Sequence, residues 1–288
     1  MKITNRLNLP EGFVKACSTA AHNAPGCVSA TTLLKGTKEI ILTRRHWDEL
    51  EDDVADRVWA IFGSAVHSLM EVETPDTFIE EDVEAKVGNM MVTGRMDCYD
   101  PKNEILYDYK TASVWKVIYK DFDDWKKQGL IYAWLLNKTG FNVKKCRFIA
   151  MLKDHSKSKA KFDATYPQSP VYVYEFNVTE SDLKATEGFI ERKVAEIERY
   201  NDCPDDTIPC CTEDERWAKP TTYAVMKNGR KTALRVFNTR AEADKLAAEQ
   251  GAGCYVEERK GTDGKCQEYC TCCEFCHYWK KFYGEVKA

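Results

Sequence analysis

The segment from Met91 to Ala112, MVTGRMDCYDPKNEILYDYKTA, most constrains the fold, because its pattern predicts two β-strands joined by a turn at Asp100 to Asn103. Side chains alternate between the two faces of a strand, so Asp108 and Lys110 share one face of the second strand. Pairing through the turn would bring Asp97 to the same edge. Two carboxylates and an ammonium suit a divalent cation with an activated water, although solvated strand faces carry such residues too.

Apolar residues at helical spacing indicate a helix on either side of this segment, from Trp47 to about Val72 and from about Phe122 to Asn137. Each helix aligns two polar residues four positions apart on one face. These pairs are His67 with Glu71, and Gln128 with Tyr132. A histidine or tyrosine on a helix also serves purely structural roles, so the spacing alone leaves both interpretations open.

The remaining elements predict an α/β fold. Gly88-Asn89 is a hairpin signal, Thr179 with Asp182 indicates a helix start, and Lys153 to Gln168 reads as a polar basic loop. The expected elements are strands at Val83 to Val87, Met90 to Tyr99, Val143 to Leu152 and Val171 to Phe176, and a helix at Glu180 to Arg199.

Size and charge bound the possible functions. With 288 residues the chain can bury a substantial core, and we expect one main domain with a smaller appendage. The net charge of −4 gives no global basic field, so any contact with nucleic acid must use local patches. Lys35, Arg44 and Arg45 form such a patch, for DNA contact or as a solvated surface. No apolar run could span a bilayer and no signal peptide is evident, so we expect a cytoplasmic protein that does not bind membranes.

The thirteen cysteines favour metal or thiol chemistry, because their number is odd and the expected compartment is reducing. Nine lie beyond residue 200, which predicts a core at 1–202 with an N-terminal helical segment and a cysteine-rich metal-binding region at 203–288. A ββαβ insert is expected at about 221–259, with a hairpin turn at Asn228-Gly229, a helix from Thr239 to Gln250 and a strand from Tyr255 to Glu258.

One ordered set of residues resembles the RecB-like branch of the PD-(D/E)xK nuclease superfamily, over roughly residues 25 to 200. The set consists of His67, Asp97, Asp108 with Lys110, and Gln128 with Tyr132. The resemblance implies a restriction-endonuclease-like core, a mixed sheet flanked by helices. The second acidic position of the family is often glutamate, and Asp108 stands there in this chain.

The resemblance also implies roles for these residues. His67, Asp97 and Asp108 would hold Mg²⁺ or Mn²⁺, and Lys110 would orient or deprotonate the attacking water. Gln128 and Tyr132 would position the lysine or contact the substrate strand. Glu71 would support the metal ligands, although solvation of the helix end explains it equally well.

The C-terminal cysteines add a second resemblance. Cys266-x3-Cys270-x5-Cys276 is similar to the C-terminal triplet of iron–sulfur nucleases in this branch, where the usual spacing is two and then five residues. This implies a 4Fe-4S cluster, with tetrahedral Zn²⁺ as the alternative. The fourth ligand in this chain is expected to be Cys211. The alternatives are Cys17 or Cys27 before the core, and Cys272 or Cys273 within the loop.

Together the resemblances imply a phage-encoded, metal-dependent DNA exonuclease of recombination, repair or replication, acting in the bacterial host cytoplasm. DNA is the expected partner, along with a recombination or replication protein. The alternatives are a structure-specific endonuclease and a non-catalytic DNA-binding or assembly subunit with a vestigial site.

Overall fold

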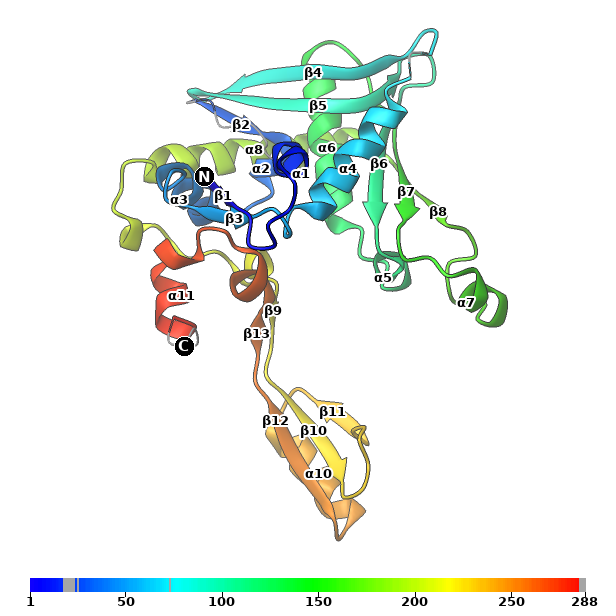
Figure 1. Ribbon diagram of the computed structural model, residues 1–288, viewed down its shortest axis with the longest axis vertical. Helices are drawn as coiled ribbons and strands as arrows, with labels where there is room; N and C mark the ends of the chain where they lie inside the picture. Colours follow the sequence, from blue (N-terminus) through cyan, green and yellow to red (C-terminus); the bar gives the residue numbers. More distant parts are fainter. Residues whose placement is uncertain (18–23, 25, 73, 285–288) are drawn as a thin grey trace. The chain divides into compact units, whose positions relative to one another are not determined.

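The computed structural model describes residues 1–17, 24, 26–72 and 74–284. The chain divides into two compact units, Met1–Cys203 and Pro204–Ala288 (Figure 1). In the described residues no helix combines the length and the apolar character needed to cross a membrane.

The first unit is built on a mixed six-stranded sheet, with strand order β2-β5-β6-β7-β8 and with β4 paired to β5. The β2–β5 and β6–β7 pairs are parallel, and the other pairs are antiparallel. The strands are β2 (Cys27–Ser29), β4 (Phe78–Val87), β5 (Met90–Asp100), β6 (Ile105–Ala112), β7 (Lys145–Leu152) and β8 (Val171–Asn177). The mixed α/β arrangement expected from the sequence is confirmed.

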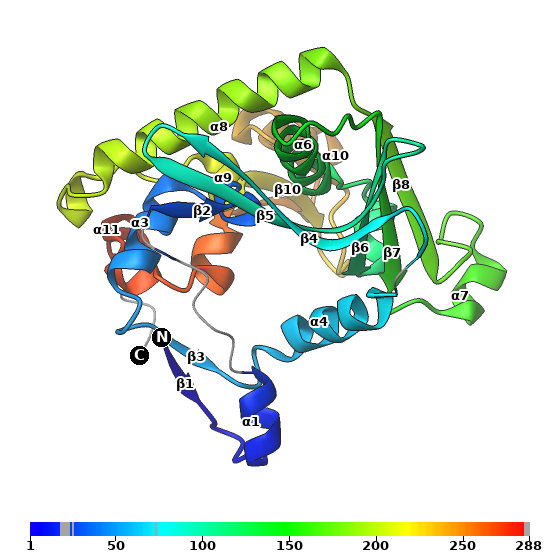
Figure 2. The same ribbon diagram turned by 90° about the horizontal axis from the view of Figure 1, so that it is seen from above.

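Helices cover both faces of this sheet, with α6 and α8 on one side and α4 on the other (Figure 2). A glycine in α6 permits close packing, because a Cβ at Gly129 would lie 3.0 Å from the Phe148 ring of β7. Trp125 of α6 stacks on the same ring, with centroids 5.7 Å apart. The helices are α1 (Glu11–Cys17), α2 (Ala30–Leu33), α3 (Thr37–Arg45), α4 (Val58–Met70), α5 (Val114–Ile118), α6 (Asp123–Lys138), α7 (Lys157–Phe162) and α8 (Glu180–Tyr200).

The predicted turns of the first unit are confirmed. Gly88, at φ 55°, and Asn89 join β4 to β5. The Asn89 amide donates to Glu198 of α8 at 2.6 Å, which ties the tip of the hairpin to that helix. The Asp100 carboxylate accepts from two amides of the following turn, each at 3.0 Å. At α8, Thr179 and Asp182 form the expected capping box.

The predicted helix from Trp47 to Val72 is wrong in its first half. A short strand, β3 (Glu51–Asp53), pairs in parallel with β1 (Lys2–Thr4), and α4 begins only at Val58. The physical reason lies in Asp53, whose carboxylate accepts from Thr4 Oγ1 at 2.7 Å and from the Arg6 and Ala55 amides. An aspartate that bonds nearby backbone amides competes with helix formation. The segment expected as a basic loop, Lys153 to Gln168, also differs, because it contains α7 with Ser156 as its N-cap.

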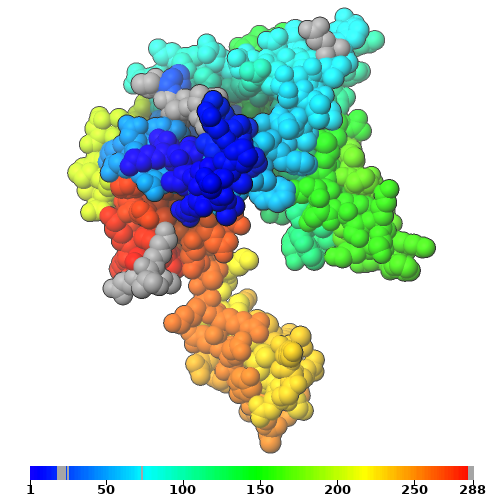
Figure 3. All heavy atoms as spheres, in the orientation of Figure 1, coloured from blue at the N-terminus to red at the C-terminus, as the bar shows by residue number. Residues whose placement is uncertain are grey.

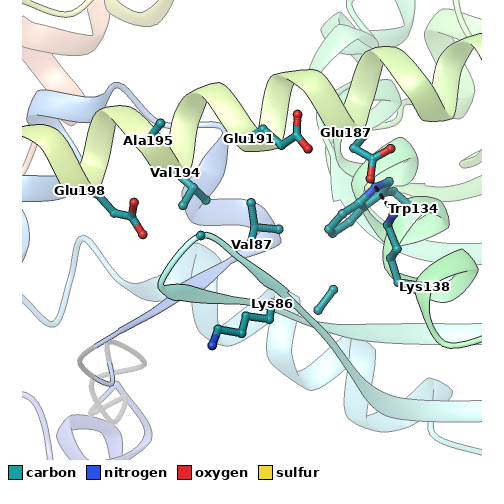
Figure 4. A pocket seen from close by; sticks show the side chains of 11 residues that line it. Lys86, Val87, Trp134, Lys138, Glu187, Glu191, Val194, Ala195 and Glu198 are labelled. Atoms are coloured by element: carbon teal, nitrogen blue, oxygen red, sulfur yellow. Dashed lines mark hydrogen bonds and ion pairs between the residues drawn. The ribbon is translucent and has the colours of Figure 1, made fainter.

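A pocket of about 370 Å³ lies between the β4–β5 hairpin, α6 and α8 (Figure 4). Two of its three glutamates have partners, since Glu187 pairs with Lys138 at 2.5 Å and Glu198 accepts from Asn89. The candidate catalytic acids of β5 and β6 do not line it.

The second unit contains a three-stranded sheet, order β11-β10-β12, with helix α10 between its second and third strands along the chain. The turn at Asn228-Gly229 is present, but β11 begins only at Arg235, so the connection is longer than a two-residue hairpin. The β9–β13 pair joins this sheet to the cysteine segment. The elements are a 3₁₀-helix (Asp205–Thr207), α9 (Glu213–Arg216), β9 (Ala218–Lys219), β10 (Thr222–Lys227), β11 (Arg235–Phe237), α10 (Arg240–Gln250), β12 (Cys254–Arg259), β13 (Thr262–Asp263), a π-helix (Lys265–Tyr269), a 3₁₀-helix (Cys273–Phe275) and α11 (His277–Phe282).

A buried carboxylate organises the end of the second unit. Asp263 accepts hydrogen bonds from the Tyr278 and Tyr283 hydroxyls at 2.7 and 2.8 Å, and from Arg216 Nε at 3.1 Å. The Arg216 guanidinium also stacks 4.6 Å above the Tyr278 ring. These bonds connect β13 to α9, α11 and the residue that follows α11.

Candidate active site

Asp97 is positioned where β5 and β6 separate. Their ladder runs from the Asp100–Ile105 pair only as far as the Cys98–Tyr107 pair. Beyond it, the Asp97 carboxylate accepts from the Tyr109 amide at 2.6 Å and replaces a strand-to-strand bond. The hydrogen bond fixes Asp97 beside β6, as the predicted strand pairing required.

His67 reaches the same place from α4. Its Nδ1 lies 3.3 Å from Asp97 Oδ1 and 3.9 Å from Glu80 Oε1. The hydrogen bond to Asp97 raises the pKa of His67 and outweighs partial burial, which lowers it. The imidazole therefore holds a proton more readily than a free histidine while no metal competes for it.

Asp108 and Lys110 project from β6 on one face, in agreement with the alternation. Asp108 is 4% exposed, and Lys110 Nζ approaches its Oδ1 to 2.6 Å as an ion pair. Burial raises the pKa of Asp108 to about 6, with Lys110 opposing the rise and Asp97 adding to it.

Glu80 is a site residue that the sequence reasoning missed. It lies in β4 opposite Asp97, with a φ of 52°, in the left-handed region that non-glycine residues rarely adopt. Its carboxylate accepts a hydrogen bond from Arg95 Nε at 2.8 Å and lies 3.9 Å from His67 Nδ1. Burial and the Asp97 charge raise the pKa of Glu80.

A register signal could have identified Glu80. A two-residue turn at Gly88-Asn89 makes the residue numbers of each β4–β5 pair add to a constant, as the Val87–Met90 pair shows. The same count places Glu80 opposite Asp97.

Glu80, Asp97 and His67 form the one group of three possible metal ligands found in residues 1–17, 24, 26–72 and 74–284. One ligand atom from each lies within 4.8 Å of the others. The predicted ligand set was His67, Asp97 and Asp108. Two of these residues, His67 and Asp97, belong to the group together with Glu80, and Asp108 pairs with Lys110 at 2.6 Å.

Gln128 and Tyr132, the two polar residues predicted on one face of α6, also lie near this site. Tyr132 is 8% exposed, and Gln128 forms a side-chain hydrogen bond with it. Burial raises the pKa of Tyr132, and the charges of Asp108 and Asp97 add to the rise. The aromatic ring fits against Gly94 of β5, where a Cβ would lie 2.5 Å from Tyr132 Cε1. Glu71 ends α4 close enough for its charge to act on Glu80.

The basic patch makes intramolecular contacts. Arg44 donates to the Cys27 carbonyl at 2.6 Å, and Arg45 donates to the Asn201 carbonyl at 2.7 Å. Lys35 lies 3.8 Å from Glu39. These contacts fasten α3 to β2 and to the end of α8, and the DNA contact stays a prediction.

The cysteines of the described chain form no disulfide bonds with one another. Burial raises the pKa of Cys266 to about 12, and the nearby Cys270 and Cys276 thiols add to the rise. Cys270 Sγ lies 3.7 Å from Cys272 Sγ. The carbonyl of Cys211 accepts from Arg216. In the part of the chain described here, the four predicted sulfur ligands do not gather within 4.8 Å of one another.

Neither a protein-family model nor a curated protein matches the chain. Solved structures similar to it include SSO0001, at 16% identity with a TM-score of 0.45, covering 67% of this chain and 86% of that one. The alkaline exonuclease LHK-Exo from Laribacter hongkongensis is 12% identical with a TM-score of 0.40, covering 61% and 90%. A phage related exonuclease from Haemophilus somnus 129PT is 11% identical with a TM-score of 0.27, covering 57% and 75%. These TM-scores are too low to carry an argument about fold or function.

Proposed function

We propose that the first unit is a metal-dependent nuclease that hydrolyses phosphodiester bonds in DNA. The observation that carries the proposal is the convergence of Glu80, Asp97 and His67 from three elements, next to the Asp108–Lys110 pair. Structural ion pairs alone would not need a strained glutamate between an acid and a histidine.

The donor set fits a divalent cation. Carboxylate oxygens are the ligands of Mg²⁺, and an imidazole makes a site more tolerant of Mn²⁺. Asp97, Glu80 and His67 would hold the ion, with the buried carboxylate of Asp108, paired with Lys110, as a further ligand. When bound, the cation would polarise the phosphate and lower the pKa of an attacking water.

Other protein side chains would position the attacking water and stabilise the transition state. Lys110, held at 2.6 Å from Asp108, would orient the water and neutralise charge that develops on the phosphate. Tyr132, supported by Gln128, would limit the movement of this pair from the α6 side.

The more specific parts of the proposal are supported by the order of the sequence motifs along the chain. They are exonuclease action in recombination, repair or replication, a phage origin and a protein partner from those processes. A 4Fe-4S cluster in the second unit, with zinc as the alternative, is supported by the proximity of Cys270 and Cys276 to Cys266. With Cys211 as the fourth ligand, the cluster would fasten the end of the chain.

The test is digestion of linear and circular DNA, single- and double-stranded, with Mg²⁺ or Mn²⁺. Lys110→Ala should lower kcat by about 10²- to 10³-fold, because it removes a charge placed at the transition state. Lys145→Ala is the matched control, since Lys145 is a strand lysine paired with Glu175 at 3.2 Å on β8. Equal turnover by both variants would contradict the proposal, and linear-only digestion would support an exonuclease.

A further inference from the structure

Helix α4 exposes large apolar side chains although it carries a candidate catalytic residue. None of its residues is buried. Trp59 is 61% exposed and Phe62 is 44% exposed, and the two rings meet edge to face with centroids 6.4 Å apart. The light-blue spheres of this segment lie at the surface (Figure 3). Monomeric proteins seldom leave such a patch without a use.

A second pair of exposed rings lies on α5 and on the residue that follows it. Trp115 is 52% exposed and Tyr119 is 73% exposed, and their rings stack with centroids 5.7 Å apart at an angle of 23°. Two exposed, nearly parallel rings offer flat faces to a ligand, as a base requires.

A lysine connects the two pairs. Lys153 places its ammonium 3.7 Å from the centroid of the Trp59 ring. Its amide donates to the Ala112 carbonyl at 3.0 Å, and the next residue, Asp154, accepts from Ser113 and Val114 at the start of α5. An exposed cation therefore lies between the rings of α4 and the start of α5.

Both pairs are tied to the candidate active site. β6 carries Asp108 and Lys110 and ends at Ala112, directly before α5. α4 carries His67 and contacts β6, where a Cβ at Gly63 would lie 3.9 Å from Thr111 Oγ1. A strand bound to the rings would thus lie next to the acids.

We propose that Trp59, Trp115, Tyr119 and Lys153 bind a single-stranded segment of the substrate next to the cleavage site. The rings would stack on unpaired bases, and Lys153 would pair with a phosphate. This inference rests on the proposed nuclease function, and it names single-stranded DNA, or an unpaired DNA end, as the species that enters the site. A duplex does not expose base faces for stacking.

The test measures binding without cleavage. Fluorescence anisotropy in EDTA would use a labelled 20-nucleotide oligo(dT) and a blunt hairpin duplex of equal length. Trp115→Ala, Tyr119→Ala and Trp59→Ala should each weaken oligo(dT) binding by about 5- to 150-fold, the range for one stacked base. Duplex binding should change less, and Trp115→Phe should retain most of the affinity. Tyr255→Ala is the matched control, since Tyr255 is 48% exposed in the second unit.

The outcomes separate this inference from the proposed function. If the wild type cleaves DNA and the ring variants bind oligo(dT) as it does, the ring surface is not a DNA site and the nuclease assignment stands. If the wild type cleaves nothing with either metal, the proposed function fails whatever the binding shows. A change of oligomeric state in Trp59→Ala with unchanged oligo(dT) binding would identify a protein interface and overturn the proposal. Equal losses for duplex and oligo(dT) would overturn the preference for single strands.

Discussion

The buried carboxylate of Asp108 should cost stability in the metal-free protein, and Asp108→Asn tests this cost. Burial raises the pKa of Asp108 from the ordinary value of 3.8 to about 6. Each pKa unit corresponds to about 1.36 kcal/mol, so keeping the carboxylate ionised at pH 7 costs about 3 kcal/mol of folding free energy. Asparagine resembles the neutral acid in shape, so the variant should be more stable than the wild type by up to this amount.

The sign of the pH dependence follows from the same shift. The folded state binds a proton more tightly than the unfolded state, so the wild type should gain stability as the pH falls from 7 through about 6 towards 4. The asparagine variant should lack this part of the gain. His67, whose pKa is raised chiefly by its hydrogen bond to Asp97, should still stabilise both proteins as the pH falls.

Urea unfolding in EDTA, followed by tryptophan fluorescence, would measure the effect at several pH values. Mg²⁺ or Mn²⁺ should stabilise the wild type more than the variant, and the proposed nuclease activity should be lost in the variant. Asp100→Asn is the matched control. The pKa of Asp100 is lowered by hydrogen bonds from Asn103, so its replacement should destabilise the protein. A metal-free Asp108→Asn protein clearly less stable than the wild type would refute the reasoning.

Three further changes test other parts of the structure. Gly94→Ala places a Cβ 2.5 Å from the Tyr132 ring, so it should cost about 1–3 kcal/mol in urea unfolding and lower activity, whereas Gly12→Ala, with no atom within 4 Å, should do neither. Thr179→Ala removes the cap of α8 and should cost about 1 kcal/mol, and Thr179→Ser should restore it in the same assay. Burial raises the pKa of Asp263, but hydrogen bonds from two tyrosines and an arginine outweigh it and leave the pKa lowered. Asp263 therefore stabilises the fold above about pH 4 and loses this effect as the pH falls, so thermal unfolding of Asp263→Asn should show a weaker dependence on acid pH.

Sequence patterns predicted correctly those structural features that depend on residues close together in the chain. The alternation in β6 correctly places Asp108 on the same face as Lys110, and the Thr179 capping signal correctly marks the start of α8. The helix expected from Trp47 failed because Asp53 bonds to residues near the N-terminus, a contact that no window of sequence contains. Glu80 was missed because its place opposite Asp97 follows only from counting the strand register back from the Gly88-Asn89 turn, and its positive φ in the middle of a strand has no signature of its own.

The bond between Asn89 and Glu198 has a consequence for synthesis of the protein. The hairpin that carries Glu80 and Asp97 leaves the ribosome about a hundred residues before the helix that holds its tip, and Glu198 lies near the end of that helix. Thr37 and Lys138 also donate hydrogen bonds to this helix, to Glu196 and Glu187, and these bonds cannot form before the helix is synthesised. A nascent or prematurely released chain that ends before Glu180 therefore lacks the bond that holds the tip of the hairpin that carries Glu80 and Asp97. The proposed nuclease activity should therefore reach its full level only once α8 has been made.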